Sequence, residues 1–154
     1  MSKFLSLLLS FEGRIPSSRF WLGFIVTSVL TALVSYPLNP AAYNGEDHVT
    51  VADTTWQLLM LTPLTALTIK RFNDRNWPWW FGYVPNGLVA VGIIANHFGY
   101  LSEPERFSAI EWVFVWTACP AVLLALADNG LLKGTNGPNR YGPDPLQGLD
   151  QSSS

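Results

Sequence analysis

The stretch "KRFNDRNWPWW" places the residue types of an anion-binding site next to one another. Three cations and one carboxylate fall within residues 70–75, and three Trp follow them. A guanidinium offers a planar fork of donors that matches phosphate and carboxylate oxygens, so Arg71 and Arg75 are candidates to bind an anionic headgroup or a phosphate. A structural alternative fits the same residues. In it, the stretch is a tight interfacial hairpin in which Asp74 pairs with a neighbouring Arg and the indole rings anchor the next helix.

A second polar stretch, "GTNGPNRYGPDP", occupies residues 134–145. Its glycines permit positive φ, its prolines fix turns and its Asn side chains can close Asx turns. We therefore expect a fixed, irregular tail that lies across the cytoplasmic end of the molecule, with Arg140 and Asp144 beside Arg71 and Asp74. The candidate members of a charge network or headgroup site at that end are Arg14, Arg19, Arg71, Asp74, Arg75, Asn139, Arg140, Tyr141 and Asp144.

No residue pattern predicts catalysis or a bound metal. His48 lies in an acidic loop and His97 near the end of an apolar block, and neither belongs to a ligand pattern. Neither a Ser-His-acid order nor a phosphate-cradling GxxxxGK[ST] motif occurs. Cys119 is the single cysteine and lies within an apolar block, where it is expected to act as a small apolar side chain. We expect no catalytic residue, no cofactor and no metal ion, so an enzyme is unsupported.

Composition and hydropathy predict the elements that position these residues. Charged residues make up 13% of the 154-residue chain, about half of the roughly 25% in a soluble globular protein. A helix of about 20 apolar residues crosses a bilayer core. Four blocks approach that length and have no charge in their central part, namely residues 20–37, 52–69, 79–100 and 110–127. The alternative, a soluble domain with an unusually apolar core, would space its apolar residues at amphipathic intervals. We predict an all-α membrane protein, a single domain over residues 1–148 that forms a four-transmembrane-helix bundle.

The basic residues predict how the four helices are threaded. Eight of the nine Lys and Arg lie on one side of the alternating blocks, and Arg106 alone lies on the other. Lys and Arg concentrate in cytoplasmic loops, so both termini are expected in the cytoplasm. Aromatic side chains near the block ends agree with this threading, and the candidate interfacial anchors are Trp21, Trp56, Trp77, Trp79, Trp80 and Trp112.

Shorter signals predict how the helices begin and end. Apolar residues among positions 4–11 share one face of an N-terminal interfacial helix. Asp53 is the predicted cap of the second block, and "SAIE" at 108–111 has the spacing of a capping box for the fourth. Three blocks contain an internal proline, which frees a carbonyl that a neighbour must satisfy: Pro63, Pro85 and Pro120.

The C-terminal end of the fourth block contains a carboxylate that needs a cationic partner. Asp128 is placed at the C-terminus of this helix, where a carboxylate opposes the helix dipole, so Lys133 or Arg71 is expected to approach it. Residues 149–154 carry no structural signal and are expected to be a disordered tail.

Three segments, "FEGRIPSSRFW", "KRFNDRNWPWW" and "GTNGPNRYGPDP", resemble in this order the hallmark segments of the DUF805 family, small bacterial inner-membrane proteins of unknown function. The residues that carry the resemblance are Gly13, Arg14, Arg19, Phe20, Trp21, Arg71, Asp74, Trp79, Trp80 and 139–145. Departures are Phe72, Asn73 and Pro78, where the family usually has Leu, His and Gly. Without that His, the second segment loses any titration or metal role in this chain. The resemblance implies a helical fold in a bacterial inner membrane and no established activity.

We hypothesise a non-catalytic protein of the inner (cytoplasmic) membrane whose cytoplasmic face binds another protein or anionic lipid. The expected partners are the lipid bilayer, anionic lipid headgroups or another membrane protein, and a second copy of the chain as a homo-oligomer. A net charge of −2 without a dense Lys/Arg cluster argues against nucleic acid. The alternative is a small transporter or channel, in which Asn86 and Asn96 would line a path or bond between helices.

Overall fold

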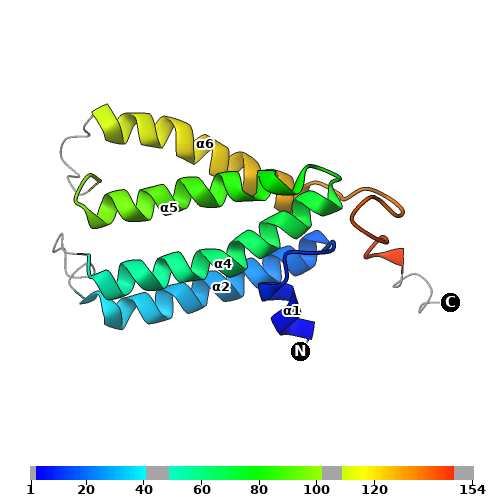
Figure 1. The fold of residues 1–154 in the computed structure, drawn as a ribbon, viewed down its shortest axis with the longest axis horizontal. Coiled ribbons are helices and arrows are strands. Elements are labelled where there is room, and N and C mark those ends of the chain that lie inside the picture. The colour runs from blue at the N-terminus through cyan, green and yellow to red at the C-terminus, as the bar shows by residue number, and fades with distance from the viewer. Residues whose placement is uncertain (1–2, 41–48, 102–108, 148–154) are drawn as a thin grey trace.

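The computed structural model describes residues 3–40, 49–101 and 109–147, and the regular structure within these ranges is helical (Figure 1). Its elements are α1 (Lys3–Leu9), α2 (Ser17–Leu38), α4 (Val51–Asp74), the 3₁₀ helix η1 (Trp79–Gly82), α5 (Tyr83–His97) and α6 (Ala109–Leu131). The tail after α6 contains one isolated antiparallel bridge between Asn139 and Gly142. The all-α class predicted from the sequence is confirmed.

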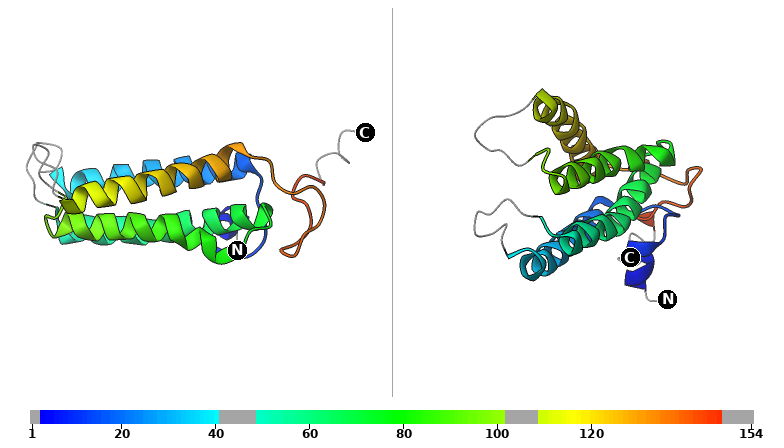
Figure 2. Two further views of the ribbon diagram at one scale, coloured as in Figure 1. Left: turned by 90° about the horizontal axis from the view of Figure 1, so that it is seen from above. Right: turned by 60° about the vertical axis from the view of Figure 1, so that its left-hand side comes forward.

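Helix α4 is the central element of the molecule, because it packs against α1, α2, η1 and α5 and also contacts α6. Its C-terminal part, Thr65–Asp74, is continuously buried. In Figure 1, α5 and α6 approach α2 and α4 at the end where α1 and the tail lie, and Figure 2 shows the tail at this end from two further directions. Ile15, Phe20 and Leu67 form a small apolar core there, and side chains of α1 pack against it.

Two helices, α2 and the part of α6 from Glu111 to Leu131, are long and apolar enough to cross a membrane. Only 17% of the most apolar window of each is buried inside the protein, so their apolar side chains face outward. Leu33, Trp116 and Leu124, for example, are each about two-thirds exposed or more. In water such surface would be unfavourable, so these two helices support a membrane association.

The second apolar block is longer than predicted. Residues 70–74, expected in a loop, continue α4 to Asp74, and Asn76, at φ 59°, reverses the chain after the helix. Arg71 and Asp74 are three positions apart and form an ion pair within the last turn, which favours the helix. The helix also begins differently, since the Thr50 hydroxyl accepts the Asp53 N–H at 3.2 Å and is the cap in place of Asp53.

The third and fourth blocks also differ from the predicted bounds. Residues 79–100 divide into η1, α5 and a turn. Gly82, where η1 meets α5, lets the backbone of this segment approach α4 closely, because a Cβ at position 82 would lie 2.9 Å from the Ile69 Cα. Pro85 falls in the first turn of α5, where its missing N–H costs little. Helix α6 continues to Leu131, so Asp128 lies inside the helix and does not mark its end.

Some predictions fall outside the described residues. These are the predicted disorder of residues 149–154, the surroundings of His48 and Arg106, and the role of Ser108 in the predicted capping box.

Candidate functional site

The last turn of α4 places a cation and a carboxylate at the polar end of the molecule, and both are buried. Arg71 Nη1 donates to Asp74 Oδ2. The other Arg71 donors reach across to α6 and the residue after it, where Nε donates to the Asn129 carbonyl and Nη2 to the Leu132 carbonyl. Arg71 is 1% exposed, so its guanidinium has no face left for an external ligand in this conformation.

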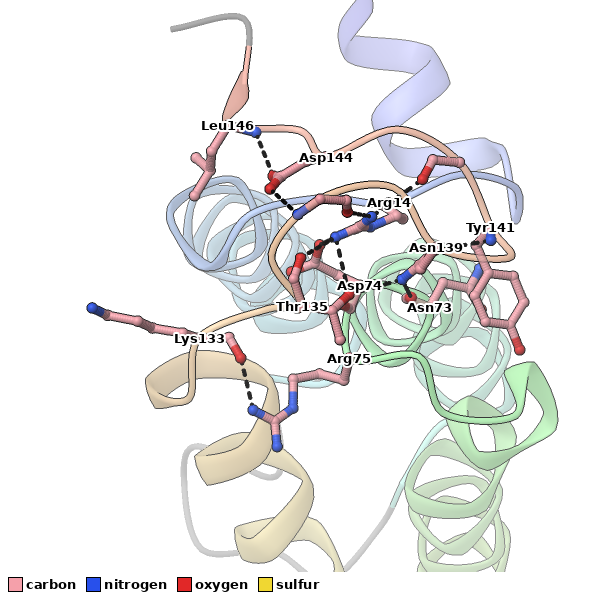
Figure 3. A network of polar contacts seen from close by, with 12 residues as sticks. Arg14, Asn73, Asp74, Arg75, Lys133, Thr135, Asn139, Tyr141, Asp144 and Leu146 are labelled. Carbon is pink, nitrogen blue, oxygen red and sulfur yellow. Dashed lines mark hydrogen bonds and ion pairs between the residues drawn. The ribbon is translucent and has the colours of Figure 1, made fainter. Parts of the chain in front are cut away.

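Arg14, in the segment before α2, completes this arrangement from the other side. Its Nε donates to Asp74 Oδ1 at 3.0 Å, and its Nη1 and Nη2 donate to tail carbonyls: Gly137 at 2.8 Å, Gly142 at 3.2 Å and Thr135 at 2.7 Å (Figure 3). The Arg14 and Asp74 side chains are 1% and 4% exposed. We call Arg14, Arg71 and Asp74 the arginine–aspartate clasp, because one carboxylate holds two guanidiniums from distant parts of the chain.

The clasp contains two positive charges and one negative charge, so the carboxylate alone cannot neutralise it. Backbone carbonyls of the tail and of α6 provide the remaining negative potential, which a buried cation requires. The tail is therefore an electrostatic component of the clasp. This geometry supports a structural role for Arg14 and Arg71, closing the end of the helix bundle.

The tail has a defined shape where it meets the clasp. Thr135 donates from N and Oγ1 to the Asp74 carbonyl at 2.9 and 2.8 Å, and Asn139 Nδ2 donates to the Asn73 carbonyl at 2.9 Å. Asp144 Oδ2 accepts the N–H of Gly137 at 2.8 Å. A second backbone donor, the N–H of Leu146, bonds Asp144 Oδ1, and these hydrogen bonds to the charged form lower the pKa of the Asp144 carboxyl.

Arg140 and Tyr141 lie on the outer side of the tail. Arg140 donates to the Asn76 carbonyl at 3.0 Å, and its guanidinium lies over the Tyr141 ring, 4.7 Å from the centroid. The Tyr141 hydroxyl donates to the Trp77 carbonyl at 2.7 Å. Within the described part of the chain Arg140 forms no ion pair, so the structure does not bring it to Asp74 as the sequence suggested.

Asp128 has a partner that the sequence did not indicate. Its Oδ1 accepts from Arg75 Nη2 at 3.1 Å, and Arg75 Nη1 also donates to the Lys133 carbonyl at 2.7 Å. Both side chains are about one-fifth exposed. Because α4 extends to Asp74, Arg75 caps it and faces α6, whereas the Arg71 side chain is committed to the clasp.

Arg19 is not a member of the clasp, and it lines, together with Arg14, a groove of about 420 Å³ between α1, α2 and α4. We call this the α1 groove, and its walls include Phe4, Glu12, Leu22 and Lys70. The Lys70 ammonium donates to the Ser6 and Leu7 carbonyls, at 2.8 and 2.6 Å, and so satisfies the C-terminal end of α1.

The predicted anchors divide into two groups. The Trp21 and Trp56 indoles join α2 to its neighbours, because Trp21 Nε1 donates to the Gly130 carbonyl at 3.1 Å and Trp56 Nε1 to the Thr31 carbonyl at 3.3 Å. The other four candidates have exposed side chains, at 41–54%: Trp77, Trp79, Trp80 and Trp112.

Several residues of this end were not among the predicted site residues. Gly134 packs against Asp74, Asn73 donates to the Gly13 carbonyl, and Thr135 bonds the end of α4. Their types are ordinary for a turn, and only the docked tail reveals their contacts.

The fold and this closed end define a small all-helical protein with at least two helices suited to a membrane and a tail tied to α4 and to the segment before α2. A model of the family described as "Protein of unknown function (DUF805)" matches residues 8–143, and the chain belongs to this family. The chain is similar to uncharacterized protein YiiR of Escherichia coli strain K12, with 30% identity over 139 residues that cover 89% of this chain and 86% of that protein. YiiR of Escherichia coli O157:H7 matches over the same shares with the same identity. No solved structure matches.

Proposed function

We propose that this protein is a multi-pass protein of the bacterial inner membrane, with four spans and both termini in the cytoplasm, and that its cytoplasmic end binds anionic lipid headgroups without catalysis. Helix lengths support four spans. The 24 residues of α4 extend about 36 Å. The 15 residues of α5 extend about 22 Å and the four of η1 add about 8 Å, and a bilayer core is about 30 Å thick.

The distribution of cations supports the orientation. The described Lys and Arg side chains lie at the end that holds α1 and the tail, and positive residues concentrate on the cytoplasmic side of membrane proteins. Reporters fused after Ser154 test this directly. A cytoplasmic fluorescent reporter should be active there and a periplasmic phosphatase inactive, and the reverse result contradicts the threading.

The observation that carries headgroup binding is the state of Arg19. Its side chain is exposed, and no described residue accepts a hydrogen bond from it. Beside it in the α1 groove, Lys70 has three ammonium donors and uses two on α1 carbonyls within the described chain. The groove therefore offers the exposed guanidinium of Arg19 to a phosphate, whereas Lys70 is 3% exposed and its ammonium holds the end of α1.

The surroundings of Arg19 suit a lipid phosphate better than a free one. Phe4 and Leu22 line the same groove and are 45% and 55% exposed, which provides an apolar surface for an acyl chain. Glu12 also lines the groove and reduces its positive potential. The candidate headgroup role thus moves from Arg71 and Arg75, whose guanidiniums contact protein acceptors, to Arg19.

Lipid retention in nanodiscs tests this assignment. Arg19→Gln should lower the retention of phosphatidylglycerol about fivefold, because one basic side chain at an anionic leaflet contributes about 1 kcal/mol. Phosphatidylcholine retention should not change, and Glu12→Gln should raise phosphatidylglycerol retention. Lys133→Gln is the matched control, since Lys133 is an exposed cation at the same end but outside the groove. An equal loss in both cation variants would show general charge attraction and contradict a built site.

The alternative, a small transporter or channel, is favoured by one observation. Asn86 lines a space between the helices, beside Asn129 of α6. Conductance and flux measurements on the reconstituted protein test this role. Flux that Asn86→Leu abolishes while phosphatidylglycerol retention stays unchanged would favour transport over headgroup binding.

A further inference from the structure

A second pocket, of about 490 Å³, lies at the polar end of the molecule where four segments of the chain meet. The segment before α2, helix α4, the η1–α5 region and the tail each contribute to its walls. Among the described residues no Lys or Arg lines it, in contrast to the α1 groove. Half of its lining residues are aromatic, namely Phe11, Trp79, Tyr83 and Tyr141.

Two of these rings form adjacent walls that are open to a ligand. Trp79 and Tyr83 are four positions apart, with their ring centroids 5.8 Å from each other and their planes 83° apart. Their side chains are 54% and 47% exposed. The face of an aromatic ring carries negative potential and attracts a cation. One face of the Tyr141 ring is already covered by the Arg140 guanidinium, so Tyr141 contributes shape to the pocket.

The charge of the pocket also favours a cation. Glu12 is its single charged lining residue, and this side chain is exposed. Glu12 forms no ion pair with any described residue, and the guanidinium of nearby Arg14 is held in the clasp. An anion here would meet a carboxylate and the negative faces of the rings, whereas a cation would be attracted by both.

Contacts within the chain hold the walls in place. Asn73 Nδ2 donates to the Gly13 carbonyl at 3.1 Å, which fixes the segment of Phe11 and Glu12 against the end of α4. The Tyr141 hydroxyl donates to the Trp77 carbonyl at 2.7 Å, and its ring points away from Arg14 (Figure 3). A pocket that is formed before its ligand arrives loses less entropy on binding.

The hydrogen-bonding groups of the pocket narrow the class of cation. A primary ammonium has three N–H donors to satisfy, and Ca²⁺ takes six or more oxygen ligands. The pocket offers the Glu12 carboxylate and the hydroxyls of Tyr83 and Tyr141, because the Asn73 amide oxygen is buried. A quaternary ammonium donates no hydrogen bond, and its methyl groups pack against ring faces. The walls therefore match a quaternary ammonium best.

We propose that this pocket binds an organic quaternary ammonium group, with Glu12 as its counter-ion and Trp79 and Tyr83 as its aromatic walls. We call it the ammonium pocket. It is additional to the binding of anionic headgroups by Arg19, and it recognises the opposite charge. The quaternary ammonium has two sources, a free cation such as choline and the choline headgroup of a lipid, which experiments in detergent and in nanodiscs distinguish.

Equilibrium binding of radiolabelled choline to the full-length protein in a neutral detergent tests the free cation. We expect saturable binding that tetramethylammonium displaces. The neutral isostere 3,3-dimethylbutanol has the same shape without the charge and should compete about tenfold less well, and ethanolamine should also compete less well than choline. In nanodiscs, retention of phosphatidylcholine that free choline does not displace assigns the site to the lipid headgroup, provided that Trp79→Leu lowers this retention.

Two variants locate the binding. Trp79→Leu keeps an apolar side chain but removes a ring face, and it should weaken choline binding about two- to fivefold. Trp80→Leu is the matched control, since Trp80 is equally exposed but lies outside the pocket. Glu12→Gln should weaken choline binding about two- to fivefold while it raises phosphatidylglycerol retention in the α1 groove. Both altered side chains are exposed, so the Tm should not change.

Four results would overturn the proposal. Equal competition by 3,3-dimethylbutanol would show that apolar contact alone fills the pocket, and equal competition by ethanolamine would contradict the quaternary class. The same loss in Trp79→Leu and Trp80→Leu would show a general effect of interfacial indoles. If neither Trp79→Leu nor Glu12→Gln changes the binding of choline or the retention of phosphatidylcholine, the cation binds elsewhere or not at all.

Discussion

Gly134 lies directly against the carboxylate of Asp74, so that a Cβ atom at position 134 would come within 1.9 Å of Asp74 Oδ2. Asp74 cannot withdraw, because Arg14 and Arg71 hold both of its oxygens. We predict that Gly134→Ala destabilises the folded protein by about 1–3 kcal/mol, the usual cost of overpacking. Thermal unfolding in mild detergent, followed by Trp fluorescence, measures this.

The matched control for that variant is Gly87→Ala in α5, where an added Cβ meets no atom within 4 Å. Ala is the better helix former, so this change should be neutral or stabilising by up to about 1 kcal/mol. Equal destabilisation by both variants would contradict the close contact at Gly134.

Asp74→Asn should have a larger effect, because it leaves two buried guanidiniums without a counter-ion. Breaking a buried ion pair by removing one partner costs about 3–5 kcal/mol. Asp128→Asn removes a carboxylate whose pair with Arg75 is about one-fifth exposed, and it should cost less than about 1 kcal/mol. Chemical unfolding of the two variants under one condition compares them, and similar losses would refute a special role for Asp74.

Arg71→Lys tests whether shape or charge matters in the clasp. The guanidinium reaches Asp74 and the carbonyls of Asn129 and Leu132 with separate donors. An ammonium is a point charge without this planar fork, so it leaves at least one buried acceptor unpaired at a cost of about 1–3 kcal/mol. Arg75→Lys is the control. If the two changes lower the Tm equally, the planar geometry of Arg71 has no special importance.

Low pH should loosen the fold of the tail through Asp144, whose carboxylate accepts hydrogen bonds from the tail residues Leu146 and Gly137. Backbone donors lower the pKa of its carboxyl below the usual 3.8, so the folded state favours the charged form. This contribution is fully present above the unfolded pKa and is lost as the pH falls through the lowered folded value. The amide chemical shifts of Gly137 and Leu146 report it, and Asp144→Asn should remove the pH-dependent change. Persistence of the same transition in that variant would assign it to another group.

The sequence predicted the elements of the fold better than their ends. Apolar blocks located the long helices because hydropathy depends on local composition. The end of α4 was placed wrongly because "KRFND" is polar, yet it is buried and finds partners in α1, α6 and the tail. Hydropathy cannot distinguish a solvated polar loop from a polar helix turn that finds partners in distant segments.

The candidate site shows a similar limit. The sequence selected Arg14, Arg71 and Asp74 as members of one end, and the structure brings these three together. The sequence also placed Arg140 beside Asp74. In the structure Arg14 takes that position, and it donates to the Thr135 and Gly137 carbonyls. Main-chain acceptors are present at every residue, so side-chain types cannot show which of them a guanidinium will find.

The docked tail also has a consequence for the order of assembly. Arg14 and the Gly142 carbonyl that it contacts are 128 positions apart. During translation, α2 and α4 leave the ribosome well before residue 142, so the Arg14 donors that bond tail carbonyls have no such acceptors until the tail emerges. A nascent chain stalled before that point therefore lacks the carbonyls that complete the clasp, and its positive charge stays uncovered.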